Sequence, residues 1–287
     1  MAGTLSYLGI RLDRLTVPEL IDEIKFCIIQ QTKLMVSYYG FHTANIIQSS
    51  KNAENNFNSL DILTPDGIAV LWTSWLFASP LTVENRMNAD SDSSGRAALG
   101  DSTGAWFEVL SQVAGKGVSV GEGPGDIVGP FLYSEAIDQG WGIYLFGGVP
   151  GVALGAAIKL KSAFPGLRIV GTHHGYLNSQ DEKQEVIKDI NQSEAEIVLV
   201  GMGQPAQEEW IVANRNRVHA AVLVGVGGYF DHVIRRIDCY PLWVYQCRLN
   251  WIYRLMLEPK RLWRRYTIGL VRFFFHVLVG KILGVNH

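Results

Sequence analysis

The chain has 287 residues, of which 48% are hydrophobic and 18% are charged, and its net charge is −2. This composition excludes an intrinsically disordered chain, and the length allows one large or two small globular domains with a substantial core. Residues 241–287 hold eight Lys/Arg and one acid, a charge of +7 against −9 for the remainder, which favours an anionic partner such as phosphate groups or a membrane surface.

The first residues lack the charged and apolar regions of a signal peptide, so we expect a cytoplasmic protein. The cysteines have no metal-ligand spacing, and reduced thiols are expected at Cys27, Cys239 and Cys247. We expect neither a cofactor nor a nucleic-acid partner.

Short apolar runs alternate with amphipathic stretches of helical length. The predicted strands are 34–39, 141–148, 168–172, 196–203 and 220–228. The predicted helices are 151–164, 180–193 and 205–218. Because the strands are almost continuously apolar, the alternation predicts an α/β fold, with a Rossmann-like parallel sheet flanked by helices.

Two segments depart from this alternation. Residues 90–126 are rich in Gly, Ser and Asp and have weak periodicity, which indicates an insertion in a core domain spanning residues 1–240. Residues 241–287 are expected to form a helical, membrane-associating appendage. Its apolar stretch 266–283 contains Arg272, His276 and Lys281, so we expect an interfacial helix rather than a spanning one. The side chains expected to face lipid are Phe273, Phe274, Phe275, Leu278 and Ile282.

Glycine-rich turns follow several predicted strands, at 147–151, 201–205, 225–228 and Gly40. Ligands of such sheets bind beyond the carboxyl ends of the strands, where glycine permits close approach and helix N-termini can bind phosphate. Each turn alone is also typical of an ordinary strand-to-helix connection. Together they favour a nucleotide-type ligand.

Polar residues in the two earliest turns have two interpretations each. Asp66 can be a helix N-cap or a general base, and Thr43 and Asn45 can be turn residues or site residues. Asp90 and Asp92 could hold a divalent ion, although no strand precedes them.

In the tail, Arg254, Arg261 and Arg264 could be solvated or could clamp a diphosphate. Pro259 leaves open whether one helix carries all three arginines.

Ordered motifs across the chain resemble the WecG/TagA/CpsF family of bacterial glycosyltransferases, glycosyltransferase family 26. They are HTAN (42–45), PDG (65–67), LFGG (145–148), FPGLRIVGTHHGY (164–176), VGMGQPAQEEW (200–210), GVGGYFD (225–231) and NWIYRLMLEPKRLWRRY (250–266).

The resemblance implies an inverting, metal-independent glycosyltransferase, of hexosyl or N-acetylhexosaminyl type. It would move a sugar from a UDP-sugar to a polyprenyl-diphosphate-linked glycan. The enzyme itself would be attached peripherally to the inner face of the bacterial plasma membrane. It also implies Asp66 as the base, with Thr43 and Asn45 near the reacting groups. The substrate-binding residues that it implies are Gly67, Gly147, Gly148, Gly201, Gly203, Gln207, Glu208, Gly227, Asp231, Arg254, Arg261 and Arg264.

The chain departs from the family pattern after residue 231, where Arg235 and Cys239 stand at the expected Gly and Arg positions, and at Asn250. The insertion also leaves Asp90 and Asp126 as rival matches for the family's sugar-site Asp. These departures leave open a membrane-docked nucleotide-sugar binding protein without catalysis. A third alternative is a soluble nucleotide-dependent enzyme of another kind. It would require that residues 241–287 are dispensable for both membrane binding and activity.

Overall fold

The protein is described from a computed structural model that covers residues 3–15, 17–66, 70, 129–235, 252, 255–256 and 259–282. A parallel six-stranded sheet runs in the order β4-β3-β8-β7-β5-β6. Its strands are β3 (Leu34–Tyr39), β4 (Ile62–Pro65), β5 (Gly142–Gly147), β6 (Arg168–His173), β7 (Ile197–Gly201) and β8 (Val222–Gly225). The predicted α/β fold with a parallel sheet is confirmed.

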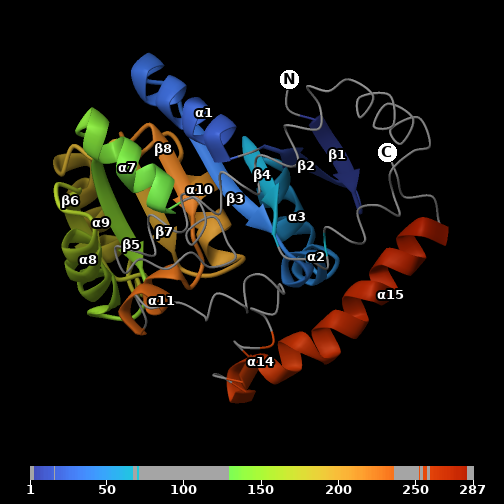
Figure 1. Cartoon of the computed structure of the whole chain (residues 1–287). Coiled ribbons are helices and arrows are strands. Elements are labelled where there is room, and N and C mark those ends of the chain that lie inside the picture. Colours follow the sequence, from blue (N-terminus) through green and yellow to red (C-terminus); the bar gives the residue numbers. More distant parts are fainter. Residues whose placement is uncertain are drawn as a thin grey trace.

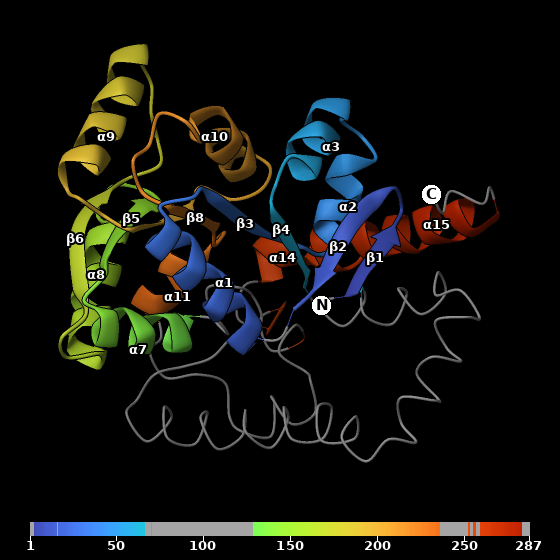
Figure 2. The ribbon, with the colours of Figure 1, turned by 90° about the horizontal axis from the view of Figure 1, so that it is seen from above.

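Helices cover both faces of this sheet, as Figure 2 shows. One face carries α1 (Val17–Gln30), α7 (Gly129–Gln139), α8 (Val152–Ala163) and α11 (Tyr229–Arg235). The other carries α2 (Phe41–Ile47), α3 (Lys51–Asn58), α9 (Gln180–Gln192) and α10 (Ala206–Asn214). Side chains alternate between the two faces along each strand. Thus Ile143 and Leu145 enter one apolar cluster, while Tyr144 and Phe146 enter the other.

An antiparallel hairpin, β1 (Gly3–Tyr7) and β2 (Ile10–Arg14), lies beside β4. The C-terminal helices α14 (Pro259–Tyr266) and α15 (Ile268–Ile282) follow, and α15 packs against α2 (Figure 1). Phe273 and Val277 of α15 are buried with Tyr7 and Tyr39 in the second apolar cluster. The prediction that Phe273 faces lipid is therefore wrong, because its ring fills the contact between α15 and the core.

The other four side chains expected to face lipid are exposed on α15: Phe274, Phe275, Leu278 and Ile282. No helix in the described ranges is both long and apolar enough to cross a membrane. The helix α14 begins at Pro259, in agreement with proline at a first helical position.

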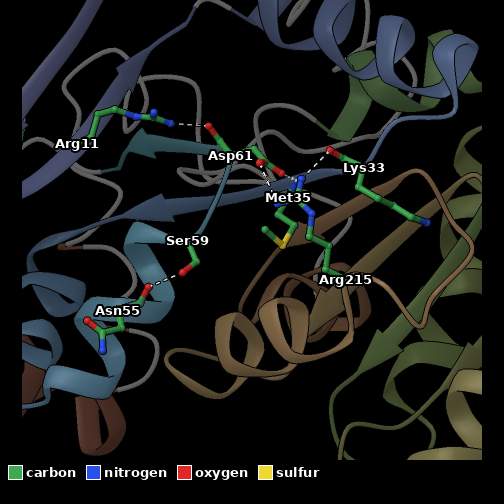
Figure 3. A network of polar contacts seen from close by, with 7 residues as sticks. All are labelled: Arg11, Lys33, Met35, Asn55, Ser59, Asp61 and Arg215. Atoms are coloured by element: carbon green, nitrogen blue, oxygen red, sulfur yellow. Dashed lines mark hydrogen bonds and ion pairs between the residues drawn. The ribbon is translucent and has the colours of Figure 1, made fainter.

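A polar network at the amino ends of the strands joins the hairpin, β3 and α10 (Figure 3). Asp61 accepts a bond from Met35 N at 2.8 Å and forms an ion pair with Arg215 at 3.1 Å. Arg11 donates to the backbone oxygen of Asp61 at 2.7 Å. The network ties together the amino ends of β3 and β4, opposite the ends that lead to Gly40 and Asp66.

Several predictions concern residues outside the described ranges. These are the insertion 90–126, the boundary at 240/241, Gly67, Asp90, Asp92, Asp126, Cys239, Cys247, Asn250 and Arg254. Cys27 is a buried free thiol on α1.

Candidate active site

The turns named by the sequence all follow the carboxyl ends of strands at one edge of the sheet. Gly40 follows β3, Asp66 follows β4, Gly148 follows β5, and Gly227 lies just beyond β8. The strands β5 and β7 are neighbours, yet α8 leaves β5 on one face and α10 leaves β7 on the other. Such a reversal opens a crevice where ligands of doubly wound sheets bind. The carboxyl ends of the strands point toward α11 and α14 (Figure 1).

The turns after β5 and β7 touch through backbone atoms. Gly148 N donates to Gly201 O at 3.0 Å, and Gly175 N, in the segment after β6, donates to Gly148 O at 2.9 Å. A Cβ atom at Gly147 would lie 2.3 Å from Gly201 O, and Gly147 has a φ of +147°. Only glycine fits this contact. The glycine-rich turn that was interpreted as part of a ligand site is therefore also required for close packing of the backbone.

Asp66 and Gly40 lie side by side at the ends of β4 and β3. Asp66 N donates to Tyr39 O at 2.9 Å. The Oδ2 atom of Asp66 lies 3.7 Å from the point where a Cβ on Gly40 would stand. The half-buried carboxylate thus borders the N-terminus of α2. Since β4 ends at Pro65 on the outside of the sheet, the proline removes no ladder bond that the fold needs.

Thr43 lies in the first turn of α2, in a segment interpreted from the sequence as a loop. Its hydroxyl accepts a bond from Gly40 N at 3.0 Å and donates to Gln204 Oε1 at 2.6 Å. The side chain is fully buried. These bonds cap the helix and leave the hydroxyl facing the protein interior.

Gln207 and Glu208, which the family resemblance implies as substrate-binding residues, are also fully buried. Glu208 Oε1 accepts bonds from Ser37 Oγ at 2.6 Å, Gln207 Nε2 at 2.7 Å and Gln204 Nε2 at 3.3 Å. Burial raises the pKa of Glu208 to about 6, although these bonds oppose the shift. The two side chains therefore lie inside the protein, where they support the turns through hydrogen bonds.

Asn45 joins α2 to the C-terminal helices. Its Nδ2 donates to Gly269 O at 2.7 Å. Arg265 lies over the Phe41 ring at 5.8 Å. Burial, together with the Arg265 charge, lowers the pKa of His42 to about 4, so this histidine is neutral at physiological pH. The contact places basic α14 next to the helix that carries Thr43.

The remaining predicted residues are distributed around this edge. Asp231 is half-buried in the first turn of α11, and Gly203 has a left-handed φ of +78°. Arg264 is exposed and lies over Trp263 at 5.5 Å, whereas only the backbone of Arg261 is described. In the ranges that the structure covers, no three His, Cys, Asp or Glu side chains form a metal-binding group.

Sequence reasoning missed Ser37, Gln204 and Arg265. Ser37 carried a signal, because it is the one non-aromatic polar residue of the strand LMVSYY, and its side chain is fully buried. Gln204 stands in the quoted turn GMGQP, but nothing local shows that its amide reaches Tyr38 O at 2.8 Å.

The chain was compared with known proteins. A family model described as the glycosyl transferase WecG/TagA/CpsF family matches residues 124–286, more than half of the chain. An N-acetylglucosaminyldiphosphoundecaprenol N-acetyl-beta-D-mannosaminyltransferase of Bacillus subtilis (strain 168) is 34% identical over 123 residues, 43% of this chain and 46% of the relative. The protein of that name in Staphylococcus aureus (strain NCTC 8325 / PS 47) is 30% identical over 139 residues, 48% of this chain and 53% of the relative. The aligned part of the chain spans about half the length of these relatives. The family match shows that the chain belongs to the WecG/TagA/CpsF family of glycosyltransferases.

Proposed function

We propose that the protein transfers a sugar from a UDP-sugar to a polyprenyl-diphosphate-linked glycan in the synthesis of a cell-envelope polysaccharide. The observation that carries this proposal is the family match, which runs through β5–β8 and the C-terminal helices to residue 286. The names of the relatives support the acceptor class, since both describe transfer to a diphosphoundecaprenol-linked N-acetylglucosamine. A donor of the N-acetylhexosamine type follows by the same analogy.

In the proposed mechanism Asp66 is the general base of an inverting transfer. It takes the proton of the acceptor hydroxyl as the hydroxyl oxygen bonds to the anomeric carbon of the donor. The bond between that carbon and the UDP oxygen breaks, and UDP leaves with the electron pair. The position of Asp66 at the strand edge, beside Gly40, supports this role.

The departing diphosphate gains negative charge, which the protein has to stabilise. Two features of this chain can stabilise that charge. The backbone N–H groups at the N-terminus of α8 follow the turn after β5. The second feature is α14, where Lys260 and Arg264 are exposed and no acidic residue is present. We assign Arg254 and Arg261 the same role by their place in the family motif.

The exposed face of α15 supports attachment to a membrane, where a polyprenyl acceptor resides. Phe273, Val277 and Gly280 face the protein, while an apolar stripe faces away from it. The stripe consists of Ile268, Val271, Phe275, Leu278 and Ile282, each more than half exposed. These positions recur every three or four residues, so they share one side of the helix. Arg272 and Lys281 are exposed on the same helix, as expected for an interfacial helix on anionic lipid.

The test of catalysis is UDP release from a panel of UDP-sugars, with a polyprenyl-diphosphate-linked glycan as acceptor, in EDTA and then with Mg²⁺ or Mn²⁺. Acceptor-dependent release in EDTA from one donor supports the proposal and identifies the sugar. Release that needs the metal overturns the metal-independent mechanism. Donor binding without release across a broad acceptor panel favours the binding-protein alternative.

The test of membrane attachment is sedimentation with phosphatidylglycerol vesicles. The double variant Phe275→Ser/Leu278→Ser should bind at least about tenfold more weakly, because each side chain contributes roughly 1.5 kcal/mol when buried in lipid. A matched control is Leu154→Ser/Ile158→Ser, an exposed apolar pair on α8. Equal binding by the two double variants would show that the stripe is not the lipid contact.

A further inference from the structure

Glu208 is a carboxylate placed where the protein interior makes it costly. The residue has no exposed surface, and its Oε2 atom has no hydrogen-bond partner within the described part of the chain. The side chain makes no ion pair there either. Burying an unpaired carboxylate costs several kcal/mol of folding free energy, which is about as much as a disruptive single substitution in a protein core. An apolar residue of similar volume would avoid this cost, so the presence of a carboxylate at this position has to be explained.

The reason lies in the donors that gather on Oε1. A carboxylate is only an acceptor, so the amides of Gln204 and Gln207 must both point their NH₂ groups toward Glu208. The carbonyl oxygen of each amide is then directed the other way. Gln204 Oε1 accepts from the Thr43 hydroxyl at 2.6 Å, and Gln207 Oε1 accepts from Gly227 N at 2.8 Å.

These two amides reach different turns of the candidate active site. Through Gln204 and Thr43, the chain of bonds ends at Gly40 N, next to Asp66. Through Gln207, it ends at Gly227 in the turn after β8. The negative charge of one buried carboxylate therefore sets the polarity of bonds in turns that follow β3, β7 and β8, three neighbouring strands.

We propose that Glu208 is a positioning residue that acts through Gln204 and Gln207 to fix the Gly40 turn beside Asp66 and the Gly227 turn beyond β8. This rests on the proposed function, because it supposes that those turns border the reacting groups. It assigns Glu208 no contact with the nucleotide, in contrast to the expectation from the family motif.

The first variant is Glu208→Gln, which keeps the shape and one accepting oxygen. Its new NH₂ group lets the flanking amides turn over, so the network loses its fixed polarity. We expect kcat to fall by about 10- to 100-fold, the scale of a misplacement of about 1 Å, while KM for the UDP-sugar stays within about threefold. The matched control is Glu209→Gln in the same helical turn, where the carboxylate is exposed and, among the described residues, accepts a bond from Asn52 of α3 at 3.1 Å. A normal kcat in a folded Glu208→Gln protein would overturn the proposal, and so would a change in KM alone.

A second measurement does not depend on activity. Hydrogen exchange at the Gly40 and Gly227 amides should be at least about tenfold faster in Glu208→Gln, with the strand amides of β7 and β8 still protected. Unchanged exchange at both glycines overturns the positioning role even if the wild type shows no transfer, so the two proposals fail separately. Should Glu208→Gln not fold, Ser37→Ala removes one donor from Oε1 and is expected to speed exchange at the same two glycines. Uniformly faster exchange across the sheet in that variant would mean a structural role only.

Discussion

The two halves of the candidate active site are built in different ways. The turns after β5 and β7 meet through backbone atoms, with glycines that leave no room for a side chain. The turns after β3 and β8 are instead joined to the turn after β7 and to the start of α10 by the buried side chains of Ser37, Thr43, Gln204, Gln207 and Glu208, which we call the carboxylate network. The first half is rigid because of steric contact, and the second because of hydrogen bonding. The first should therefore respond to added volume, and the second to altered charge or polarity.

The largest effect is expected at Asp66, which stands at the border of the carboxylate network. Asp66→Asn keeps the volume but removes the proton acceptor, so the transfer rate should fall by about 10²- to 10⁴-fold. The measurement is acceptor-dependent UDP release by a variant whose circular dichroism matches the wild type. Asp181→Asn, an exposed acid in the first turn of α9, serves as the control. Near-normal turnover by folded Asp66→Asn would remove Asp66 as the base.

Gly147→Ala tests the backbone contact between the turns after β5 and β7. The added Cβ would meet Gly201 O at 2.3 Å, and the φ of +147° is unfavourable for alanine. We expect a loss of about 3 kcal/mol or more in the free energy of unfolding, measured by denaturant titration. Gly151→Ala is the matched control, because Gly151 has a φ of +90° but nothing within 4 Å of the added atom. It should lose only about 1 kcal/mol. Equal losses would mean that backbone strain, and not close approach, makes Gly147 necessary.

This contrast also explains which parts of the structure could be predicted from the sequence. Glycine turns and apolar strands are local patterns, so β3 was predicted with its observed bounds and α9 within one residue. The Ser179 side chain caps α9 by accepting from Glu182 N, a signal that the sequence displays directly. The site edge could be predicted for the same reason, since parallel strands place their carboxyl ends together.

The carboxylate network could not be predicted, because its bonds join residues far apart in the chain. Ser37 and Glu208 are 171 positions apart, and Thr43 and Gln204 are 161 apart. The four-residue strand β4 was missed because it is short and ends in a proline. Phe273 was misread because an apolar helix can face lipid on one side and protein on the other, and periodicity alone does not say which is which.

The stability of the carboxylate network should depend on pH through Glu208. Burial raises its pKa to about 6 in the folded protein, above the ordinary value of 4.5 for a glutamate side chain. The folded state therefore binds the proton more tightly, and the stability contributed at low pH is lost as pH rises through about 6. Between pH 5 and 7.5 the wild type should lose about 1 kcal/mol relative to Glu208→Gln, which cannot titrate. Denaturant titrations of both proteins at the two pH values measure this difference. A constant difference would show that Glu208 does not titrate in this range.

Thr43 offers the finest comparison, because the family motif and the geometry suggest different roles for it. Thr43→Val keeps the shape but removes the hydroxyl, leaving Gly40 N and Gln204 Oε1 each without one bond. We expect a loss of about 1–2 kcal/mol in the free energy of unfolding, whereas Thr43→Ser keeps the hydroxyl and should lose less. If the hydroxyl acts only as a cap within the carboxylate network, kcat of folded Thr43→Val should fall less than about tenfold. A fall of a hundredfold or more, restored by Thr43→Ser, would mean that the hydroxyl leaves Gln204 during the reaction and contacts the substrate. The carboxylate network would then be part of the reacting site, and not only its support.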